Sequence, residues 1–489
     1  MPKAAVIGSG IAGLASALRL RRQGFEVDVF EKNDYTGGKI HAKQLGDYRF
    51  DLGPSLFTLP TLVEELFELF DKVPHEHFEY ITKETICNYF WDDGSFFSVP
   101  AEEAKFIDDA SRFFQEPKEK IKKYLDNSRK KYDLTAPIFL EKSLHRVSSF
   151  LNPETLKALF SINSFDLNKS LDEVNQNYFS NPKLVQFFNR FATYNGSSPY
   201  KTPGIMSMIP HLEMHLGTYL PKKGMHDISQ SLTRLAKDVG VKFHLNSNIT
   251  KIETQQNEVK AIYVDNNPVD FDVVVCNMDV YSAYKSFLKD MPKPEKTLKQ
   301  ERSSSALIFY WGVNKSFEQL DLHNIIFSNN YEQEFEHIFD KKYFFEDPTI
   351  YINITSKHIE TDAPKGSENW FVMVNAPTNE GQNWNEQTTY IREKIINKIN
   401  KNLKTNIQNH IEVEMVLTPE LIEKQTSSYQ GSLYGTSSNN KFSAFLRHPN
   451  FSSHLNNLYF CGGSVHPGGG IPLSLLSAKI VSSLTKTHL

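Results

Sequence analysis

Short apolar runs and glycine-rich breaks follow one another through the first fifty residues. Residues 4–7 are wholly apolar, residues 14–20 have the length and apolar content of a buried helix, and residues 26–31 intersperse charged with apolar side chains. Six residues, 8–13, separate the first run from the helix. This order predicts a strand, a turn, a helix and a second strand.

The rest of the chain predicts two further groups of elements. One group comprises helices at residues 59–75 and 228–236, a hairpin at 86–99 with Asp-Gly in its turn, mostly charged helices over 101–195, and strands at 240–245, 249–252, 259–264 and 272–277. The other comprises strands at 306–311, 350–354, 370–374 and 457–460, and helices at 391–403 and 473–484. Strands and helices are mixed along the chain, which predicts an α/β protein.

The first turn has the residue types that a bound dinucleotide requires. Residues 8–13 read G-x-G-x-x-G, so Gly8 permits the tight turn and Gly10 lets a pyrophosphate approach the backbone. Gly13 lets the helix pack against the sheet, and the helix N-terminus offers N–H groups to the phosphates. Glu31 ends the second strand, where its carboxylate can accept hydrogen bonds from ribose hydroxyls.

A second glycine turn lies near the C-terminus. Residues 457–463 run as a strand into Gly462 and Gly463, residues 464–472 contain five more glycine or proline positions, and a helix follows. A helix N-terminus preceded by glycines again offers backbone N–H groups to an acceptor. The sequence therefore predicts two backbone-built ends of one binding site.

Composition narrows the class of protein. The 489 residues suffice for two lobes, and a net charge of −4 with dispersed basic residues gives no indication of nucleic-acid binding. Mean hydropathy is −0.44, and no apolar run approaches the ~20 residues that span a bilayer. Cys87, Cys276 and Cys461 lie far apart and form no metal or redox motif. Aromatic residues make up 12% of the chain, enough for a long apolar cavity or an aromatic core.

Several segments together resemble one family. They are residues 8–13, Tyr-Thr-Gly-Gly-Lys at 35–39, Phe-Asp-Leu-Gly-Pro-Ser at 50–55, the runs at 213–224, 431–442 and 447–450, and Gly-Gly-Ser-Val-His-Pro-Gly-Gly-Gly-Ile-Pro at 462–472. This set resembles the bacterial-type phytoene desaturase family of carotenoid desaturases, within the amine oxidase superfamily of flavoproteins. The forms of residues 434–442 and 462–472 are most similar to its 1′-hydroxycarotenoid 3,4-desaturase branch.

The resemblance implies FAD as the cofactor, and no metal-ligand spacing stands out in the sequence, so no metal is expected. The cofactor-binding positions that it implies are Gly8, Ser9, Gly10, Ile11, Ala12, Gly13, Glu31, Lys32, Gly38, Lys39, Gly53, Pro54, Ser55, Ile249, Asn277, Met278, Gly462, Gly463, Gly470, Ile471 and Pro472. Lys39 stands where the family more often has Arg, so the positive charge is kept and the bidentate fork is lost.

Pattern and resemblance together predict a Rossmann-like FAD-binding domain interleaved with a mixed-sheet substrate domain and a helical, membrane-facing subdomain. The expected FAD-binding domain is discontinuous and comprises 1–75, 215–295 and 450–489. The substrate-binding domain comprises 76–105 and 296–449, and the helical subdomain 106–214.

The implied reaction introduces a C=C bond into an acyclic carotenoid end group, with 3,4-desaturation of a 1′-hydroxycarotenoid by hydride transfer to flavin N5. Glu213 and His466 are the candidate acids or bases, with structural roles as the alternative for each. A phytoene desaturase or a carotene isomerase is the alternative function. An amine oxidase or a non-catalytic lipid-binding module is also open, and the sequence leaves quinone and oxygen as electron acceptors.

A water-insoluble substrate implies a membrane surface as a partner. Residues 134–140 and 184–191 are the most apolar pieces of the helical region, and each can be either core or a face resting on a bilayer. The N-terminus shows no apolar signal-peptide core. The expected location is therefore cytoplasmic, with peripheral association at the inner face of the cell membrane.

Overall fold

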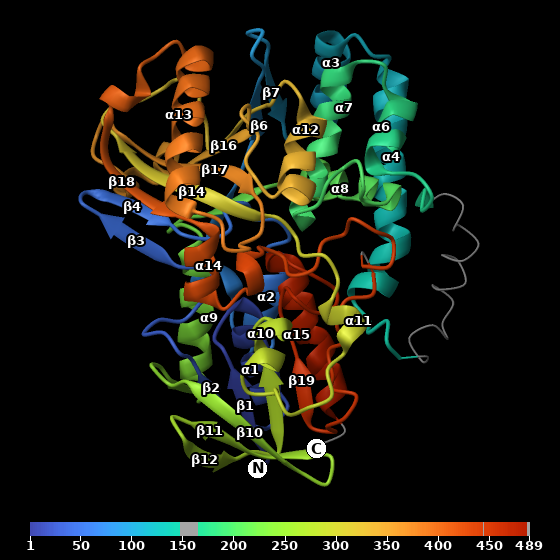
Figure 1. The fold of residues 1–489 in the computed structure, drawn as a ribbon, viewed down its shortest axis with the longest axis vertical. Coiled ribbons are helices and arrows are strands. Elements are labelled where there is room, and N and C mark those ends of the chain that lie inside the picture. The colour runs from blue at the N-terminus through green and yellow to red at the C-terminus, as the bar shows by residue number, and fades with distance from the viewer. Residues whose placement is uncertain (147–164, 444, 487–489) are drawn as a thin grey trace.

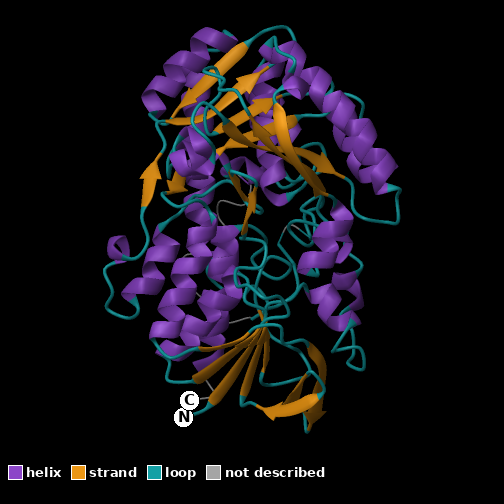
Figure 2. Cartoon of the chain, turned by 90° about the vertical axis from the view of Figure 1, so that its left-hand side faces the viewer, coloured by secondary structure: helices purple, strands orange, loops and turns teal. Residues whose placement is uncertain are grey.

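The computed structural model describes residues 1–146, 165–443 and 445–486, and its two principal sheets lie at opposite ends of the long axis. One sheet lies low in the molecule beside the N-terminus (Figure 1). The other lies at the upper end, and Figure 2 shows the two sheets separated by helices and loops. The α/β class predicted from the sequence is confirmed.

The lower sheet is parallel and has five strands in the order β19-β13-β1-β2-β9. Its strands are β1 (Lys3–Ile7), β2 (Glu26–Phe30), β9 (Lys242–His244), β13 (Val273–Cys276) and β19 (Leu458–Phe460). Ile7 pairs with Cys276, and Cys276 pairs with Phe460, so these three strands end side by side. The carboxyl edge of this sheet is where ligands bind in open parallel α/β sheets.

Both faces of the parallel sheet are covered. On one face, alternate residues such as Val6 and Val275 pack against α1 (Ile11–Arg22), α2 (Thr61–Glu68), α9 (His226–Asp238) and α15 (Ile471–Thr485). On the other, residues such as Val274 pack against α10 (Val280–Lys285) and a three-stranded sheet of β10 (Ile249–Gln255), β11 (Glu258–Val264) and β12 (Asn267–Asp270). Two-sided burial explains why the sequences of β1 and β13 are continuous apolar runs.

The upper sheet is mixed and has seven strands in the order β18-β14-β17-β16-β15-β6-β7. Its strands are β6 (Thr85–Phe90), β7 (Phe96–Pro100), β14 (Ser305–Val313), β15 (His323–Ile326), β16 (Ile350–Ile354), β17 (Glu368–Ala376) and β18 (Ile411–Leu417). The predicted hairpin at 86–99 and the strands at 306–311, 350–354 and 370–374 are confirmed. The sequence pattern missed β15 and β18.

One face of the upper sheet is closed by a long helix. The helix α13 (Trp384–Leu403) places Ile391, Ile395 and Ile399 against alternate residues of β14, β16 and β17. Side chains alternate across a strand, so the intervening residues point to the opposite face. That opposite face turns toward the middle of the molecule. Further short elements of the chain are β3 (Ala42–Leu45), β4 (Tyr48–Asp51), β5 (Tyr80–Thr82), β8 (Tyr219–Pro221), α11 (Glu295–Leu298), α12 (Tyr331–Glu336) and α14 (Pro419–Thr426). In Figure 1, α12 stands in the upper part of the molecule and α14 lies between the two sheets.

The remaining helices form a group beside the upper sheet (Figure 1). They are α3 (Glu103–Phe114), α4 (Lys118–Thr135), α6 (Leu171–Tyr178), α7 (Pro182–Asn189) and α8 (Pro210–Met214). The side chains of Leu184, Phe187, Phe188 and Phe191 are fully buried in one core cluster with these helices. Residues 184–191 therefore form core, and this segment does not present an apolar face to a membrane.

No helix in the part of the chain that the structure describes is long and apolar enough to cross a membrane. The other predicted membrane-facing segment, residues 134–140, continues the C-terminal end of α4. Ala136 and Ile138 are buried there, while Phe139 is partly buried against Phe445. Parts of this segment thus also belong to the core.

Candidate active site

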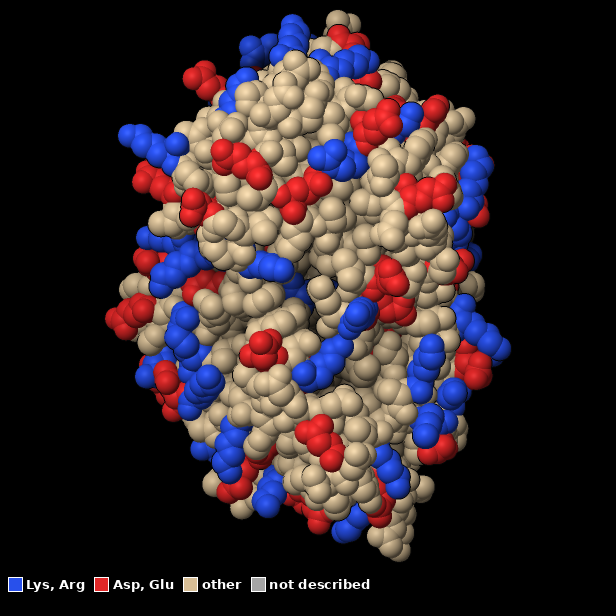
Figure 3. Space-filling model, turned by 60° about the vertical axis from the view of Figure 1, so that its left-hand side comes forward, with Lys and Arg blue, Asp and Glu red and all other residues tan. Residues whose placement is uncertain are grey.

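One cavity of about 1180 Å³ joins the two sheets. Its lining includes the turns at the carboxyl edge of the parallel sheet and side chains from the inner face of the seven-stranded sheet. Exposed Lys32 and Lys43 are also among the lining residues, so the cavity reaches the surface. Figure 3 shows a hollow near the middle of one face of the molecule, with Lys and Arg side chains at its rim.

The turn between β1 and α1 is built so that no side chain intrudes. Gly8 has a φ of +94°, a backbone conformation that residues other than glycine rarely adopt. A Cβ at Gly13 would lie 2.1 Å from the carbonyl oxygen of Gly8. The helix α1 therefore starts directly against the end of β1, and its first N–H groups, which have no partner within the helix, face the cavity at Gly10, Ile11 and Ala12.

Asn277 connects the two glycine turns. It follows β13, between the ends of β1 and β19, and its Nδ2 donates to the carbonyl oxygen of Cys461 at 3.1 Å. A Cβ at Gly10 would lie 2.7 Å from Asn277 Oδ1, and one at Gly462 would lie 2.6 Å from Asn277 Nδ2. The glycines thus leave the room that this amide occupies, and the amide fixes the distance between the turns.

Glu31 follows the end of β2 and is 5% exposed. One carboxylate oxygen accepts hydrogen bonds from the backbone N–H of Ser9 at 2.9 Å and from its hydroxyl at 2.8 Å. The other accepts from the backbone N–H of Asn33 at 3.0 Å. Glu31 therefore holds the glycine turn to the end of β2, and its carboxylate lines the cavity where two ribose hydroxyls can reach it.

The second glycine turn stands before α15. Gly470 is the N-cap of this helix, with a φ of +97°, and no described atom lies within 4 Å of a Cβ built on it. Ile471 and Pro472 form the first helical positions and line the cavity. Open space in front of a helix N-terminus gives an anion or a hydrogen-bond acceptor access to the backbone.

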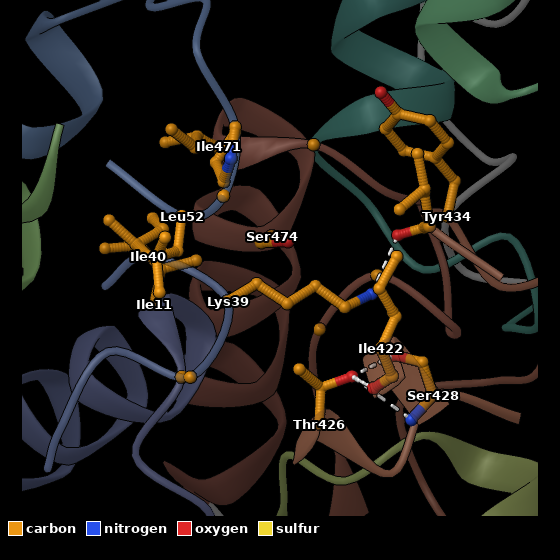
Figure 4. Close-up of a pocket in the computed structure, with 18 of the residues that line it drawn as sticks. Ile11, Lys39, Ile40, Leu52, Ile422, Thr426, Ser428, Tyr434, Ile471 and Ser474 are labelled. Carbon is orange, nitrogen blue, oxygen red and sulfur yellow. Dashed lines mark hydrogen bonds between the residues drawn. The ribbon is translucent and has the colours of Figure 1, made fainter. Parts of the chain in front are cut away.

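Lys39 reaches across the cavity from the segment that also carries Ile40 and Leu52 (Figure 4). Its Nζ donates to the carbonyl oxygens of Leu433 at 2.9 Å and Ser432 at 3.4 Å. Burial lowers the pKa of Lys39 to about 8, although Asp279 acts in the opposite direction. The Lys39 side chain therefore connects the segment at residues 35–39 to the backbone at residues 432–433.

The inner face of the seven-stranded sheet forms the opposite wall. Alternate residues on three neighbouring strands line the cavity: His323, Ile325 and Phe327 at β15, Thr349 and Tyr351 at β16, and Phe371, Met373 and Asn375 on β17. Most of this surface is aromatic or aliphatic. The wall can therefore hold an apolar ligand, with hydroxyl, imidazole and amide groups at a few fixed points.

A buried ion pair closes another part of the wall. Nη2 of Arg190 lies 2.5 Å from Glu213 Oε2, and the Tyr194 hydroxyl also donates to Glu213. The Arg190 guanidinium lies 4.3 Å from the ring centre of Phe191. Burial disfavours the charge on Arg190, yet the Glu213 carboxylate raises its pKa above the ordinary value. Removing one partner of such a pair leaves an uncompensated buried charge, at a cost of about 3–5 kcal/mol.

The two candidate acids or bases differ in position. Glu213 lines the cavity, with its carboxylate already held by Arg190 and Tyr194. His466 lies outside the described lining, and its Nε2 is 2.8 Å from the carbonyl oxygen of Lys142. Burial lowers the pKa of His466 to about 4. A catalytic role for either residue stays a prediction, and the geometry gives His466 no contact with the cavity.

The predicted cofactor positions converge on this one cavity. The lining includes Gly8, Gly10, Ile11, Ala12, Glu31, Lys32, Gly38, Lys39, Gly53, Pro54, Ser55, Ile249, Asn277, Met278, Gly462, Gly463, Gly470, Ile471 and Pro472. Ser9 and Gly13 are not among the lining residues: Ser9 donates to Glu31, and Gly13 packs against the carbonyl oxygen of Gly8. Two glycine turns, a carboxylate and a lysine from segments more than 400 residues apart fit the groups of an extended dinucleotide.

Sequence reasoning missed the residues of the opposite wall. His323, Tyr351 and Asn375 carry polar groups on three strands of the mixed sheet, and each lines the cavity. In β16, Tyr351 and Asn353 alternate with isoleucines, and this alternation is the signal that could have found Tyr351. Among the described residues, no cluster of His, Cys, Asp or Glu could hold a metal ion.

The chain is similar in sequence to known proteins. Residues 11–484 match the family described as flavin containing amine oxidoreductase. The chain is 58% identical over 484 residues to a 1-hydroxycarotenoid 3,4-desaturase from Flavobacterium sp. (strain P99-3). The aligned residues make up 99% of each of the two chains. It is 30% identical to a 4,4'-diaponeurosporene oxygenase from Staphylococcus haemolyticus, over 98% of this chain and 96% of that one.

The fold also matches solved structures. Cyclohexylamine oxidase from Brevibacterium oxydans superposes with a TM-score of 0.64, over 99% of both chains and at 14% sequence identity. At that identity the likeness shows a shared fold.

Proposed function

The chain belongs to the family of flavin-containing amine oxidoreductases, and from that premise we propose that it is an FAD-dependent carotenoid desaturase. The proposed reaction is 3,4-desaturation of an acyclic carotenoid end group that bears a hydroxyl at C1. The observation that carries this proposal is the 58% identity, over 99% of both chains, to a 1-hydroxycarotenoid 3,4-desaturase. The apolar wall of the cavity supports it, because a polyene needs a long apolar surface.

The residues at the edge of the parallel sheet would hold FAD. Gly8, Gly10 and the N-terminus of α1 would receive the pyrophosphate, Glu31 the ribose hydroxyls, and Ile471 at the start of α15 the far end of the cofactor. A bound flavin supplies a two-electron acceptor that takes a hydride at N5. The substrate also loses a proton from the neighbouring carbon, so that one C=C bond forms.

The seven-stranded sheet would orient the substrate. Ile325, Phe371 and Met373 lie on one face of it and present apolar surface to the cavity. Such a surface excludes water and holds the end group in one pose against the cofactor. Because the bond to be desaturated has no polar handle of its own, position along the cavity decides which carbons react.

The buried pair of Arg190 and Glu213 would shape the cavity. Both oxygens of the Glu213 carboxylate are already engaged, one by a guanidinium N–H and the other by a tyrosine hydroxyl. We therefore assign Glu213 a positioning role, in which it holds Arg190 and Tyr194 in the wall. Glu213→Gln should then lower stability more than it changes the pH dependence of turnover.

The division into three regions remains our proposal. Segments 1–75, 215–295 and 450–489 would form the FAD-binding domain, 76–105 and 296–449 the substrate domain, and 106–214 the helical subdomain. The strand order supports this division, because β1, β2, β9, β13 and β19 come from the first group of segments and all seven strands of the mixed sheet from the second.

A water-insoluble substrate suggests that the protein docks peripherally on a membrane surface. Phe442 and Leu446 are 64% and 46% exposed, and Phe445 between them packs on Phe139 of the 134–140 segment. Exposed apolar side chains of this kind can insert between headgroups. In liposome flotation, Phe442→Ser with Leu446→Ser should reduce the floated fraction. Full flotation of that double variant would remove this patch from the proposal.

Conversion of defined carotenoids tests the proposed function. The purified flavoprotein should convert a 1-hydroxylated acyclic carotenoid to a product with one more conjugated double bond, seen as a red shift in absorbance. Stepwise conversion of phytoene would assign a phytoene desaturase, a changed geometry with no net oxidation an isomerase, and incorporation of oxygen an oxygenase. Parallel assays with a quinone and with oxygen alone identify the electron acceptor.

A further inference from the structure

His323 opens β15 at the point where that strand enters the cavity wall. It is 3% exposed and belongs to the cavity lining. β15 pairs with β16 in antiparallel register, with His323 opposite Asn353, and Tyr351 lies on the same face two residues away. The register therefore assembles an imidazole, an amide and a phenol at one place on an otherwise apolar wall.

The partners of His323 fix its tautomer. Asn353 donates through Nδ2 to the carbonyl oxygen of Leu322 at 3.0 Å, which orients its amide, and the same Nδ2 lies 3.2 Å from His323 Nδ1. The Tyr351 hydroxyl also lies 2.8 Å from Nδ1. An amide nitrogen can only donate, so Nδ1 accepts. In the neutral ring the proton then resides on Nε2.

Tyr351 links this imidazole to the predicted cofactor side of the cavity. Its hydroxyl lies 2.8 Å from Ser55 Oγ, and Ser55 follows the Gly53-Pro54 segment that the family resemblance places beside FAD. With Nδ1 as the acceptor, the Tyr351 hydroxyl donates to His323 and accepts from Ser55. A directed chain of hydrogen bonds thus runs from Ser55 to His323 and leaves Nε2–H at its end.

Nε2 of His323 is buried and has no hydrogen-bond partner among the described residues. Burial lowers the pKa of His323 to about 3, and nearby Lys83 acts in the same direction, so the ring is neutral at physiological pH. A buried donor without a partner is costly. The Nε2 edge is covered in the ligand-free protein, so the wall that His323 lines must open slightly for a ligand oxygen to satisfy this donor. The hydrocarbon part of a carotenoid has no such oxygen.

Two other lining side chains of the described part of the chain have a buried nitrogen without a partner, His41 and Arg190. The ring of His41 stacks on the ring of Tyr35, with 3.9 Å between the ring centres, and Tyr35 begins the predicted cofactor-binding segment at residues 35–39. Arg190 is already paired with Glu213 and covered by the ring of Phe191. Of the three, His323 alone is a neutral single donor on the wall assigned to the substrate.

We propose that His323 selects the hydroxylated end group, because its Nε2–H donates a hydrogen bond to the oxygen of the substrate hydroxyl. The inference rests on the proposed function and names the group that would set its specificity. C1 and C3 of the end group are separated by a single carbon, so the hydroxyl must be read close to the reacting bond. A site built to pair with a hydroxyl rejects the analogue lacking it, since the buried donor is then left unpaired.

Two substitutions distinguish the role of Nδ1 from that of Nε2. His323→Asn keeps a polar group near the position of Nδ1 and removes the donor at Nε2, whereas His323→Gln places an amide donor near Nε2. The measured quantity is the ratio of kcat/KM for a 1-hydroxylated acyclic carotenoid to that for the 1,2-dihydro hydrocarbon of the same length. We expect this ratio to fall about 10–100-fold in the Asn variant and to stay within about 5-fold of wild type in the Gln variant.

The assay is run on flavin-loaded protein, and the flavin absorbance per chain must match wild type in each variant. Ile325→Leu is the matched control, because Ile325 lies on the same face of β15. If Ile325 acts only by its shape, this substitution should change kcat/KM for the two carotenoids by the same factor. An unchanged ratio in the Asn variant would overturn the assignment of His323 and leave the proposed function standing. Failure of flavin-loaded wild type to convert either carotenoid would overturn both.

Discussion

The two sheets contribute to the same cavity in different ways. The parallel sheet offers backbone: Gly10 and Gly470 leave the N-termini of α1 and α15 open at the ends of strands. The seven-stranded sheet offers side chains from the middle of strands, such as His323 and Met373. A ligand held by backbone N–H groups depends on the turns alone, whereas a ligand held by side chains depends on which residue occupies each alternate position.

This contrast separates what defines the family from what can vary within it. A Cβ at Gly10 or Gly13 would collide with atoms 2.7 Å or 2.1 Å away, so substitution there disturbs the fold itself. Residues 371 and 373 can change without altering the pairing of β17, because that pairing uses the backbone. Cyclohexylamine oxidase has the same fold at 14% identity, so the fold itself tolerates extensive sequence change.

The strongest test of the backbone region is Gly13→Ala. The new Cβ would lie 2.1 Å from the Gly8 carbonyl oxygen, so α1 must move away from the end of β1. We expect a loss of about 3 kcal/mol in the free energy of unfolding and loss of bound flavin. Denaturant unfolding and the flavin absorbance of purified protein measure the two effects.

Gly24→Ala is the matched control for that prediction. Gly24 lies just after the C-terminal end of α1 and has a φ of +98°. No described atom lies within 4 Å of a Cβ built there. Only the strained backbone then contributes, about 1 kcal/mol. Equal losses in the two variants would mean that close packing at the turn is unimportant.

Glu31→Ala tests the carboxylate that supports the turn. It removes an acceptor that serves Ser9 and Asn33 and that the proposal assigns to the ribose hydroxyls. We expect FAD affinity to fall about 10–100-fold, which corresponds to one or two charge-assisted hydrogen bonds of ~1.5–3 kcal/mol before compensation. Flavin titration of the stripped protein measures it. Glu26→Ala, at the other end of β2, should bind FAD as wild type does.

The parallel sheet could be predicted because its signals are local. The run at 4–7, the glycine turn and the strand at 26–31 correspond to β1, the start of α1 and β2 within one to three residues. Each signal arises from what a short stretch of chain must do: bury both faces, turn tightly, or start a helix. The same holds for the C-terminal turn, where the predicted helix at 473–484 is α15.

The substrate wall could not be predicted because its contacts are non-local. β15 has four residues, two of them polar, and it pairs in parallel with β6 more than 230 residues earlier. The contact of His323 with Tyr351 depends on strand register, which no local pattern encodes. Periodicity also could not separate a core face from a membrane face in residues 184–191, because both are apolar stripes.

Lys39, like Glu31, departs from this contrast, because both are side chains at the end of the cavity that we propose holds the cofactor. Burial lowers its pKa to about 8 in the folded protein, while the unfolded chain keeps the proton to about pH 10.4. The unfolded state therefore binds more protons between these values, and the stability of the folded state rises with pH in this window.

Lys39→Met should abolish that rise. We expect flavin-free wild type to gain on the order of 1–2 kcal/mol relative to Lys39→Met between pH 7.5 and pH 9.5. Denaturant unfolding at the two pH values gives the difference. Lys43→Met, at an exposed position nearby, is the control and should reproduce the wild-type gain. A parallel pH dependence in wild type and Lys39→Met would show that Lys39 stays charged throughout.

Tyr351→Phe gives the smallest and most specific effect, on the side-chain region. The phenol donates to Nδ1 of His323, but Asn353 also donates to that nitrogen, so the tautomer persists without the phenol. What is lost is one of two constraints on the orientation of the ring. We expect the preference for the hydroxylated substrate to fall about 3–10-fold, the loss of one neutral hydrogen bond.

The control for this last prediction removes a phenol that does not reach the cavity wall. Tyr310 lies on β14 of the same sheet, and its hydroxyl donates to the carbonyl oxygen of Leu52 at 3.3 Å. Tyr310→Phe should lower stability slightly and leave the ratio of kcat/KM values unchanged. If instead Tyr351→Phe reduced that ratio as far as His323→Asn, the phenol rather than the imidazole would be the group that meets the hydroxyl. The two sheets would still differ as proposed, because either reader is a side chain in the middle of a strand.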